Sequence, residues 1–351
     1  MEHRKLGNTG VVMPRLVFGT SSLGNLYEAV PAETKLAICR EWFTQCPMPV
    51  AIDTAGKYGA GLALETIGRN LRELGIAPDA VVISNKLGWK RMPLQCAEPT
   101  FEPGVWAGLK HDAQQRISFA GMNECWEQGC ELLGESYRPQ LVSVHDPDEY
   151  LAAAASESER RRRFDDILDA YRALGELKQR GAVRAIGVGA KDWRVIQAIE
   201  AETPLDWVML ANSLTIYRHP PELIAWVASL AAKGIGVVNS AVFHAGFLVG
   251  GRYLDYRLPA RTNAEDAAAF AWRERFHELC REWDMPPATA CVQFALHLTG
   301  VAAVALNTSA PAKIAENVAA VETLLPTQFW LAACERGLIS ILPARMTDAS
   351  D

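Results

Sequence analysis

Four polar side chains follow short apolar runs of the chain, and their chemistry fits an acid–base site. They are Asp53, Tyr58, Lys86 and His145. A tyrosine is a poor acid or base near neutral pH, but a nearby lysine ammonium lowers its pKa and an aspartate keeps that lysine charged. A histidine beside the tyrosine can orient a carbonyl oxygen or relay a proton. The set indicates a proton donor for a carbonyl group. Because none of the four supplies a hydride, carbonyl/alcohol redox with a nicotinamide cofactor fits it.

Each of these residues also has an ordinary structural interpretation. Asp53 could cap a helix, Lys86 could lie along the surface, and His145 could be a hydrogen-bonded core histidine. The interpretation as a site rests on finding all of them together at the ends of apolar runs.

Eight short apolar runs alternate with helix-period stretches, such as residues 64–74, where Leu64, Ile67, Leu71 and Leu74 share one face. The runs are 15–19, 50–53, 81–84, 141–145, 183–189, 207–210, 236–239 and 301–306. Unbroken apolar runs are typical of strands buried on both faces, so the pattern predicts a parallel sheet, either open or closed. An open sheet should carry a glycine-rich fingerprint, but the nearest match has Asp192 at its third glycine position. The count of eight favours a closed barrel, whose function lies at the C-terminal ends of the strands.

The composition excludes several classes of protein. The chain has 351 residues, of which 49% are hydrophobic and 22% charged, with a net charge of -6. These values exclude a disordered chain and argue against a dedicated nucleic-acid binder. We expect no membrane partner and a cytoplasmic protein, because neither a signal peptide nor a membrane-spanning run is present. The 8 cysteines and 7 histidines show no metal-ligand spacing, so we expect no metal site.

The chain resembles the aldo-keto reductase family over about its first 320 residues. The resemblance rests on Asp53-Thr54-Ala55-Gly56-Lys57-Tyr58-Gly59, Ser84-Asn85-Lys86, Val144-His145-Asp146-Pro147-Asp148 and the segments 5–10, 18–20, 185–189 and 306–317. It implies an α/β fold: a single (β/α)8 TIM barrel spanning 1–351, with an N-terminal hairpin, long βα loops and an extra C-terminal helix. It also implies that Asp53, Tyr58, Lys86 and His145 form the catalytic tetrad.

The resemblance further implies a nicotinamide cofactor lying across the strand ends. The residues expected to bind it are Gly19, Thr20, Asp53, Asn212, Ser240, Asn307, Thr308, Ser309, Lys313, Glu316 and Asn317. We expect a small sugar or aldehyde as the substrate and a monomer or homodimer as the assembly.

Two segments, 144–148 and 239–251, are similar to bacterial aldose dehydrogenases that oxidise L-fucose, L-galactose or D-arabinose at the anomeric carbon. A related pyridoxal-oxidising group shares much of this pattern. The resemblance therefore implies an aldose 1-dehydrogenase that produces a lactone. The alternatives are an NADPH-dependent aldehyde or ketone reductase and, in another class, a nicotinamide-binding regulatory subunit without chemistry.

The chain departs from the family pattern at the cofactor. Gly189 and Ala190 stand where many members carry Ser-Asn, and Asn239 stands where many carry a tyrosine that stacks on the nicotinamide. Where NADP-preferring members have Lys-Ser and then Arg, this chain has Asn307-Thr308 and then Lys313. A lysine lacks the guanidinium fork that grips a 2′-phosphate, so we expect NAD to be used at least as well as NADP.

Two long connections follow the third and fourth strands. Residues 88–120 include Trp89, Phe101, Trp106 and Phe119, and we expect them to form a lid in which Trp89, with Tyr58 and His145, contacts the substrate. The second connection, 147–163, contains four consecutive arginines at 160–163. Neighbouring acidic residues neutralise them, so we expect a solvated surface there.

Overall fold

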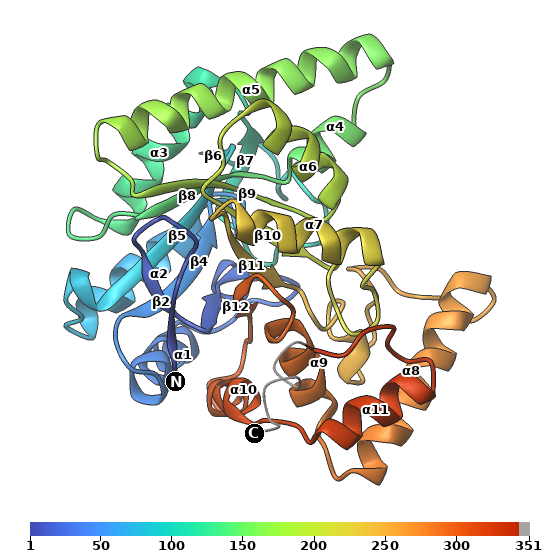
Figure 1. Ribbon diagram of the computed structural model, residues 1–351. Coiled ribbons are helices and arrows are strands. Elements are labelled where there is room, and N and C mark those ends of the chain that lie inside the picture. The colour runs from blue at the N-terminus through green and yellow to red at the C-terminus, as the bar shows by residue number, and fades with distance from the viewer. Residues whose placement is uncertain (344–351) are drawn as a thin grey trace.

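The computed structural model describes residues 1–343 and contains a closed barrel of eight parallel strands (Figure 1). Around the ring these are β3 (Leu16–Gly19), β4 (Val50–Ala55), β5 (Val81–Leu87), β8 (Leu141–His145), β9 (Ala185–Ala190), β10 (Trp207–Ala211), β11 (Gly236–Ser240) and β12 (Val301–Leu306). The ring closes where β12 pairs with β3. Each predicted apolar run coincides with one of these strands, so the (β/α)8 barrel is confirmed.

Helices connect the strands and cover the outside of the barrel (Figure 1). They are α1 (Ala32–Gln45), α2 (Leu62–Glu73), α3 (Phe119–Leu133), α5 (Glu157–Gln179), α6 (Trp193–Glu202), α7 (Pro221–Ala232), α9 (Pro287–Leu296) and α10 (Lys313–Glu322). The predicted apolar face of the helix at 64–74 is that of α2, where Leu64, Ile67 and Leu71 are buried. Within residues 1–343, no helix is long and apolar enough to cross a membrane.

An N-terminal hairpin closes the bottom of the barrel. It consists of β1 (His3–Lys5) and β2 (Val12–Pro14), which pair antiparallel. Leu6 and Met13 of this hairpin are buried against the residues of the barrel interior. Gly236 leaves room for the hairpin, because a Cβ there would lie 2.5 Å from Leu6 Cδ1. The opposite, C-terminal end of the strands is therefore the end left available for function.

Several segments are additions to the plain barrel. The lid, which we define as residues 88–118, contains the antiparallel strands β6 (Trp89–Pro93) and β7 (His111–Gln115). The predicted long connection is thus a hairpin with a loop, rather than a loop throughout. A short helix, α4 (Pro147–Ala152), follows β8. Helix α11 (Thr327–Glu335) is the expected extra C-terminal helix, and it packs on α8 (Ala264–Glu282), a helix that the sequence had not led us to expect (Figure 1).

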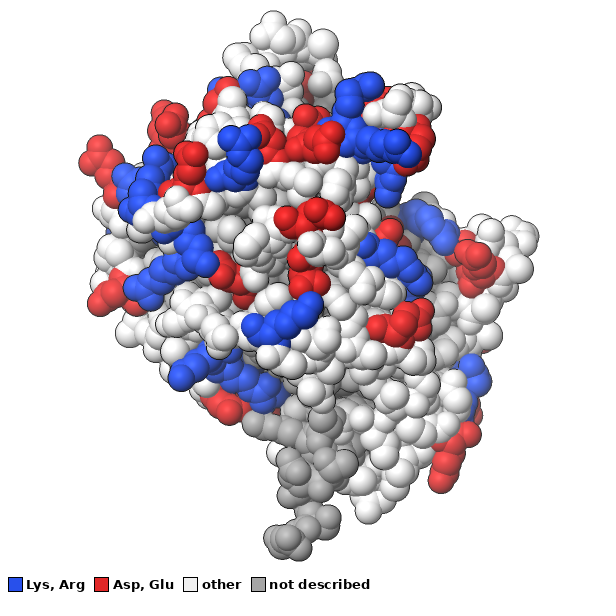
Figure 2. All heavy atoms as spheres, turned by 45° about the horizontal axis from the view of Figure 1, so that its top comes forward, with Lys and Arg blue, Asp and Glu red and all other residues white. Residues whose placement is uncertain are grey.

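The run of four arginines lies in the first turns of α5. Two of them form ion pairs within the helix: Arg163 lies 2.7 Å from Glu159 and Arg161 lies 3.8 Å from Glu157. Basic and acidic side chains intermingle over the face shown in Figure 2. The run is therefore part of a mixed, solvated surface, as expected.

Small residues inside the barrel compensate for one large one. The Trp207 side chain fills the interior and is 1% exposed. Gly187, directly opposite on the neighbouring strand β9, leaves space for it. A Cβ at Gly187 would lie 2.5 Å from the Trp207 ring and from its backbone oxygen. Strand β9 therefore depends on glycine at this position.

We predict that Gly187→Ala lowers the free energy of unfolding by about 1–3 kcal/mol, because overpacking a filled interior forces side chains and backbone to shift. The matched control is Gly175→Ala in α5, where a new Cβ meets no atom within 4 Å. That substitution should stabilise the protein by about 0.5–1 kcal/mol, because alanine replaces glycine inside a helix. Urea unfolding of both variants measures the difference, and equal effects at the two positions would contradict the prediction.

Candidate active site

The structure brings the four predicted acid–base residues together at the C-terminal end of the barrel. Asp53 lies on β4, Lys86 on β5 and His145 at the end of β8, while Tyr58 lies in the turn between β4 and α2. All four line one cavity. Parallel strands deliver their carboxyl ends to the same rim of a barrel, so residues far apart in sequence meet there.

Lys86 lies at the centre of the group. Its Nζ donates a hydrogen bond to the Tyr58 hydroxyl at 3.0 Å and another to the Asp53 carboxylate. Both members of the ion pair are buried. Burial alone would lower the pKa of Lys86, but the Asp53 carboxylate and the Tyr58 hydroxyl outweigh it and raise the pKa above its ordinary value. Lys86 is therefore a fixed cation that holds both partners in place.

The protonation of Tyr58 differs from the expectation. Lys86 does lower the pKa of Tyr58, as expected, but burial raises it by more and Asp53 adds to the rise. The net shift is upward, so Tyr58 is held as a protonated phenol at neutral pH. Lys86 thus limits the rise in the Tyr58 pKa and orients the hydroxyl.

His145 lies edge-on to Tyr58, with the ring centroids 5.6 Å apart and the planes at 85°. Burial lowers its pKa to about 3, although Asp146 opposes this shift. His145 is therefore neutral at physiological pH. Its Nδ1 is buried and has no hydrogen-bond partner among residues 1–343, whereas Nε2 lies 3.4 Å from Asp146 Oδ2.

Gly189 explains one departure from the family pattern. It faces the cavity from β9, and a Cβ on it would lie 3.3 Å from Lys86 Cε. The glycine therefore leaves room for the Lys86 side chain. It cannot hold a carboxamide through a side chain, and neither can the neighbouring Ala190, which also lines the cavity.

Asn239 does not stand where we expected a residue to face the nicotinamide. Its side chain is 0% exposed and donates a hydrogen bond to the Leu214 carbonyl at 2.6 Å. Successive strand residues point to opposite faces, and it is Ser240, one position later, that lines the cavity. The inward position at the end of β11 therefore belongs to Ser240, which was among the residues predicted to bind the cofactor.

The cavity has a volume of about 730 Å³, within the usual range for small-molecule sites. On one side the predicted cofactor residues Gly19, Thr20, Ser240, Asn307, Thr308 and Ser309 line it. Two further serines, Ser21 and Ser22, line the same side and were missed, because serines after a strand carry no sequence signal of their own. Hydroxyl groups and small side chains on this wall suit the ribose and phosphate oxygens of a dinucleotide, so the residues present fit a nicotinamide cofactor.

Ser22 joins the first and last barrel strands at this wall. Its hydroxyl lies 2.8 Å from Asn307 Oδ1 and 2.7 Å from the Thr308 carbonyl oxygen. The contacts hold the turn after β3 against the turn after β12. Contacts within the protein itself therefore hold this wall together.

The remaining predicted cofactor residues do not line the cavity. Lys313 and Glu316 are exposed on α10 and pair with each other at 2.7 Å, and Asn317 is half-buried beside them. Asn212 is buried just after β10, with a left-handed φ of 59°. Its Oδ1 has no hydrogen-bond partner among the described residues, which leaves an acceptor unused close to the cavity wall.

The lid supplies a different tryptophan from the one predicted. Trp106 lines the cavity, and its ring centroid lies 6.0 Å from that of Tyr58. Trp89 is absent from the described lining; its ring packs 5.8 Å from Phe101 and 5.3 Å from Lys57 Nζ. Trp106, rather than the expected Trp89, is therefore the lid tryptophan placed to contact a substrate in the cavity.

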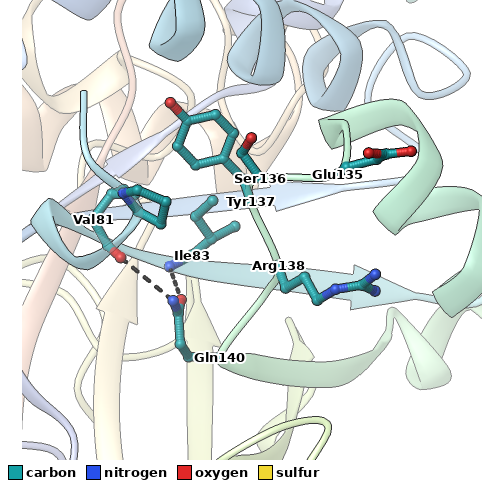
Figure 3. A pocket seen from close by; sticks show the side chains of 8 residues that line it. Val81, Ile83, Glu135, Ser136, Tyr137, Arg138 and Gln140 are labelled. Carbon is teal, nitrogen blue, oxygen red and sulfur yellow. Dashed lines mark hydrogen bonds between the residues drawn. The ribbon is translucent and has the colours of Figure 1, made fainter. Parts of the chain in front are cut away.

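A second, smaller pocket of about 300 Å³ lies at the start of β5 and β8 (Figure 3). There the Gln140 side chain accepts a hydrogen bond from the Ile83 amide at 2.7 Å. This is the N-terminal end of the strands, where barrel residues serve stability. Within residues 1–343, no group of three or more His, Cys, Asp or Glu side chains is arranged to hold a metal ion.

Known proteins resemble this chain over almost its whole length. The profile of the Aldo/keto reductase family matches residues 15–334. Pyridoxal 4-dehydrogenase of Microbacterium luteolum is 27% identical, with 97% of this chain and 98% of that protein aligned. D-threo-aldose 1-dehydrogenase of a Pseudomonas species is 26% identical over 94% of this chain and 96% of that protein. The fold matches an aldo-keto reductase of Bacillus halodurans in its holo form, with a TM-score of 0.68 and 21% identity over 97% of both chains.

We predict that His145 does not titrate between pH 5 and 8, because burial lowers its pKa to about 3. Below its unfolded pKa of about 6.5, the unfolded chain binds a proton here that the folded chain does not, so acidification from that pH toward 3 destabilises the fold through this residue. An NMR titration of the imidazole signals, with His145→Asn to assign the resonance, measures this. An inflection near pH 6.5 would contradict it.

Proposed function

The chain belongs to the aldo/keto reductase family, and we propose that within it the protein is an aldose 1-dehydrogenase that oxidises a free sugar at its anomeric carbon to the lactone. As a family member it is an oxidoreductase that acts on CH–OH or carbonyl groups with a nicotinamide cofactor.

One observation carries the proposal: the chain of hydrogen bonds from Asp53 through Lys86 to the Tyr58 hydroxyl, which ends at the cavity beside His145. When bound, a nicotinamide supplies the hydride acceptor for oxidation or the hydride donor for reduction. In our proposal the Tyr58 oxygen exchanges the proton with the reacting oxygen of the substrate. Lys86 holds the tyrosine, and neutral His145 orients the same substrate oxygen. Reduction uses the phenol and oxidation the phenolate, so alkaline pH favours oxidation.

The substrate end of the cavity suits a neutral, hydroxyl-rich ring. The Trp106 ring offers an apolar face beside Tyr58. The ammonium of Lys191 and the carboxylates of Glu102 and Asp146 offer charged donors and acceptors around it. Positive and negative groups are mixed here, so nothing favours an anionic substrate such as a sugar phosphate. The relative named for aldose oxidation supports this substrate class.

A second candidate substrate is pyridoxal, which also forms an internal hemiacetal. Aromatic side chains on the cavity wall, among them Tyr27, Trp106 and Tyr256, favour it because a pyridine ring can stack on them. A relative named for pyridoxal oxidation is of similar identity to the one named for aldose oxidation.

The adenosine end of the expected cofactor site supports NAD at least as well as NADP. Lys313 is the cation expected to meet a 2′-phosphate, and the Glu316 carboxylate lies 2.7 Å from its ammonium. A lysine also provides no bidentate contact for phosphate. These residues therefore give no basis for a strong preference for NADP.

We predict that the purified protein reduces NAD or NADP when supplied with a free aldose, and that Tyr58→Phe loses roughly 100-fold or more in turnover, the scale expected for removal of a general acid–base group. Absorbance of the reduced nicotinamide, recorded with a panel of L-fucose, L-galactose, D-arabinose, their phosphates and pyridoxal, measures both. Cofactor binding should survive the substitution.

The matched control is Tyr137→Phe, because that hydroxyl donates to the Ile76 carbonyl at the opposite end of the barrel. It should leave turnover unchanged. Activity with pyridoxal alone would select the second candidate. Activity only in the reductive direction on simple aldehydes would overturn the aldose proposal, and near-normal turnover of Tyr58→Phe would overturn the mechanism.

We further predict that kcat/KM with NAD equals or exceeds that with NADP. The Lys313 ammonium, which would bind the 2′-phosphate of NADP, is paired with the Glu316 carboxylate. Initial rates, measured at several concentrations of each cofactor with saturating sugar, give the two kcat/KM values. A preference for NADP of a hundredfold or more would be incompatible with this interpretation.

A further inference from the structure

Lys57 stands immediately before Tyr58, and its ammonium group contacts three carboxylates. Its Nζ lies 2.8 Å from Glu102 Oε1, 3.0 Å from Asp146 Oδ2 and 3.0 Å from Glu149 Oε2. The side chain is 6% exposed. An ammonium has three protons to donate, so the three carboxylates account for all of its donors.

The three carboxylates come from two segments: the lid, and the turn from β8 into α4. Glu102 belongs to the lid, and its other oxygen accepts a hydrogen bond from Trp106 Nε1 at 2.7 Å. Asp146 directly follows His145 and adopts a left-handed φ of 48°. Glu149 lies on α4. Through these contacts one ammonium connects the turn of Tyr58 to the residues beside His145 and to the tryptophan that faces Tyr58.

Within the described residues, no other lysine or arginine forms an ion pair with Glu102 or Asp146. Lys191 also lines the cavity, but its ion pair is with Glu149. Without Lys57, the carboxylates of Glu102, Asp146 and Glu149 would lie close together and repel one another. Of the three carboxylates Asp146 is buried, and a buried charge that loses its partner is strongly destabilising.

We propose that Lys57 is a positioning residue, whose ammonium fixes Trp106 and His145 relative to Tyr58 by binding Glu102 and Asp146 at once. Its effect on sugar oxidation rests on the proposed function, whereas its effect on the lid does not. A direct role in binding substrate is disfavoured, because its donors are already taken by the three carboxylates.

Hydrogen–deuterium exchange of the whole protein without substrate tests the proposal. In Lys57→Met, which keeps the aliphatic stem and removes the charge, amides in residues 100–107 and 144–150 should exchange about tenfold faster or more, since charged hydrogen bonds that restrain local opening are lost. Lys57→Arg should restore slow exchange. The matched control Lys191→Met removes an ammonium from the same cluster and should leave residues 100–107 unchanged.

Glu102→Ala separates the two connections, because it should accelerate exchange at 100–107 and leave 144–150 unchanged. If Lys57→Met does not fold, Glu102→Ala still tests whether the contact between Lys57 and Glu102 restrains residues 100–107. Unchanged exchange at 100–107 in a folded Lys57→Met or in Glu102→Ala would overturn the proposal.

The kinetic readout uses whichever sugar the wild-type protein oxidises. Lys57→Met should lower kcat by about tenfold or more, as expected when reacting groups are misplaced, with KM for the nicotinamide unchanged and recovery in Lys57→Arg. A rise in sugar KM alone would instead mean that Lys57 binds substrate, and would overturn the positioning role. If no sugar is oxidised, the proposed function fails while the exchange result still decides the role of Lys57.

Discussion

Burying the Lys86 ammonium at the end of the barrel costs free energy unless its hydrogen bonds are satisfied, and this requirement organises the rest of the site. Asp53 supplies the compensating charge from β4, and the Tyr58 hydroxyl supplies a second acceptor. Gly189 leaves the space that the lysine stem occupies. Asp53 and Lys86 come from the paired neighbouring strands β4 and β5, and Gly189 comes from β9, so the site is complete only when these three strands are assembled.

The same burial determines the protonation of the two neighbouring groups. Removing water disfavours charge, which raises the pKa of Tyr58 and lowers that of His145. Both rings are therefore neutral at physiological pH. They line the cavity and lie edge-on to each other. Lys57, whose ammonium is buried, forms a second charge group with its carboxylates beside the first, and this group connects the strand ends to the lid.

Much of the architecture follows from the order of residues along the chain. The eight apolar runs predicted the barrel strands, since strands buried on both faces must be apolar throughout. The polar residues that end those runs predicted the site. The lid was predicted only as a long connection, because pairing between β6 and β7 depends on how the chain returns at His111–Gln115. Because of this pairing, Trp106 rather than Trp89 lies against Tyr58.

The number of strands and the four polar residues that meet at their C-terminal ends could be predicted from the order of residues, because apolar runs and the residues that end them are local features. Which neighbours those four residues have depends on the tertiary structure. It turned Asn239 outward and Ser240 inward, and it placed Lys57 among three carboxylates. Such contacts join distant segments of the chain: Lys57 and Glu149 are 92 residues apart. Their distances and burial, which fix the charges and pKa values, exist only once the chain has closed into a ring.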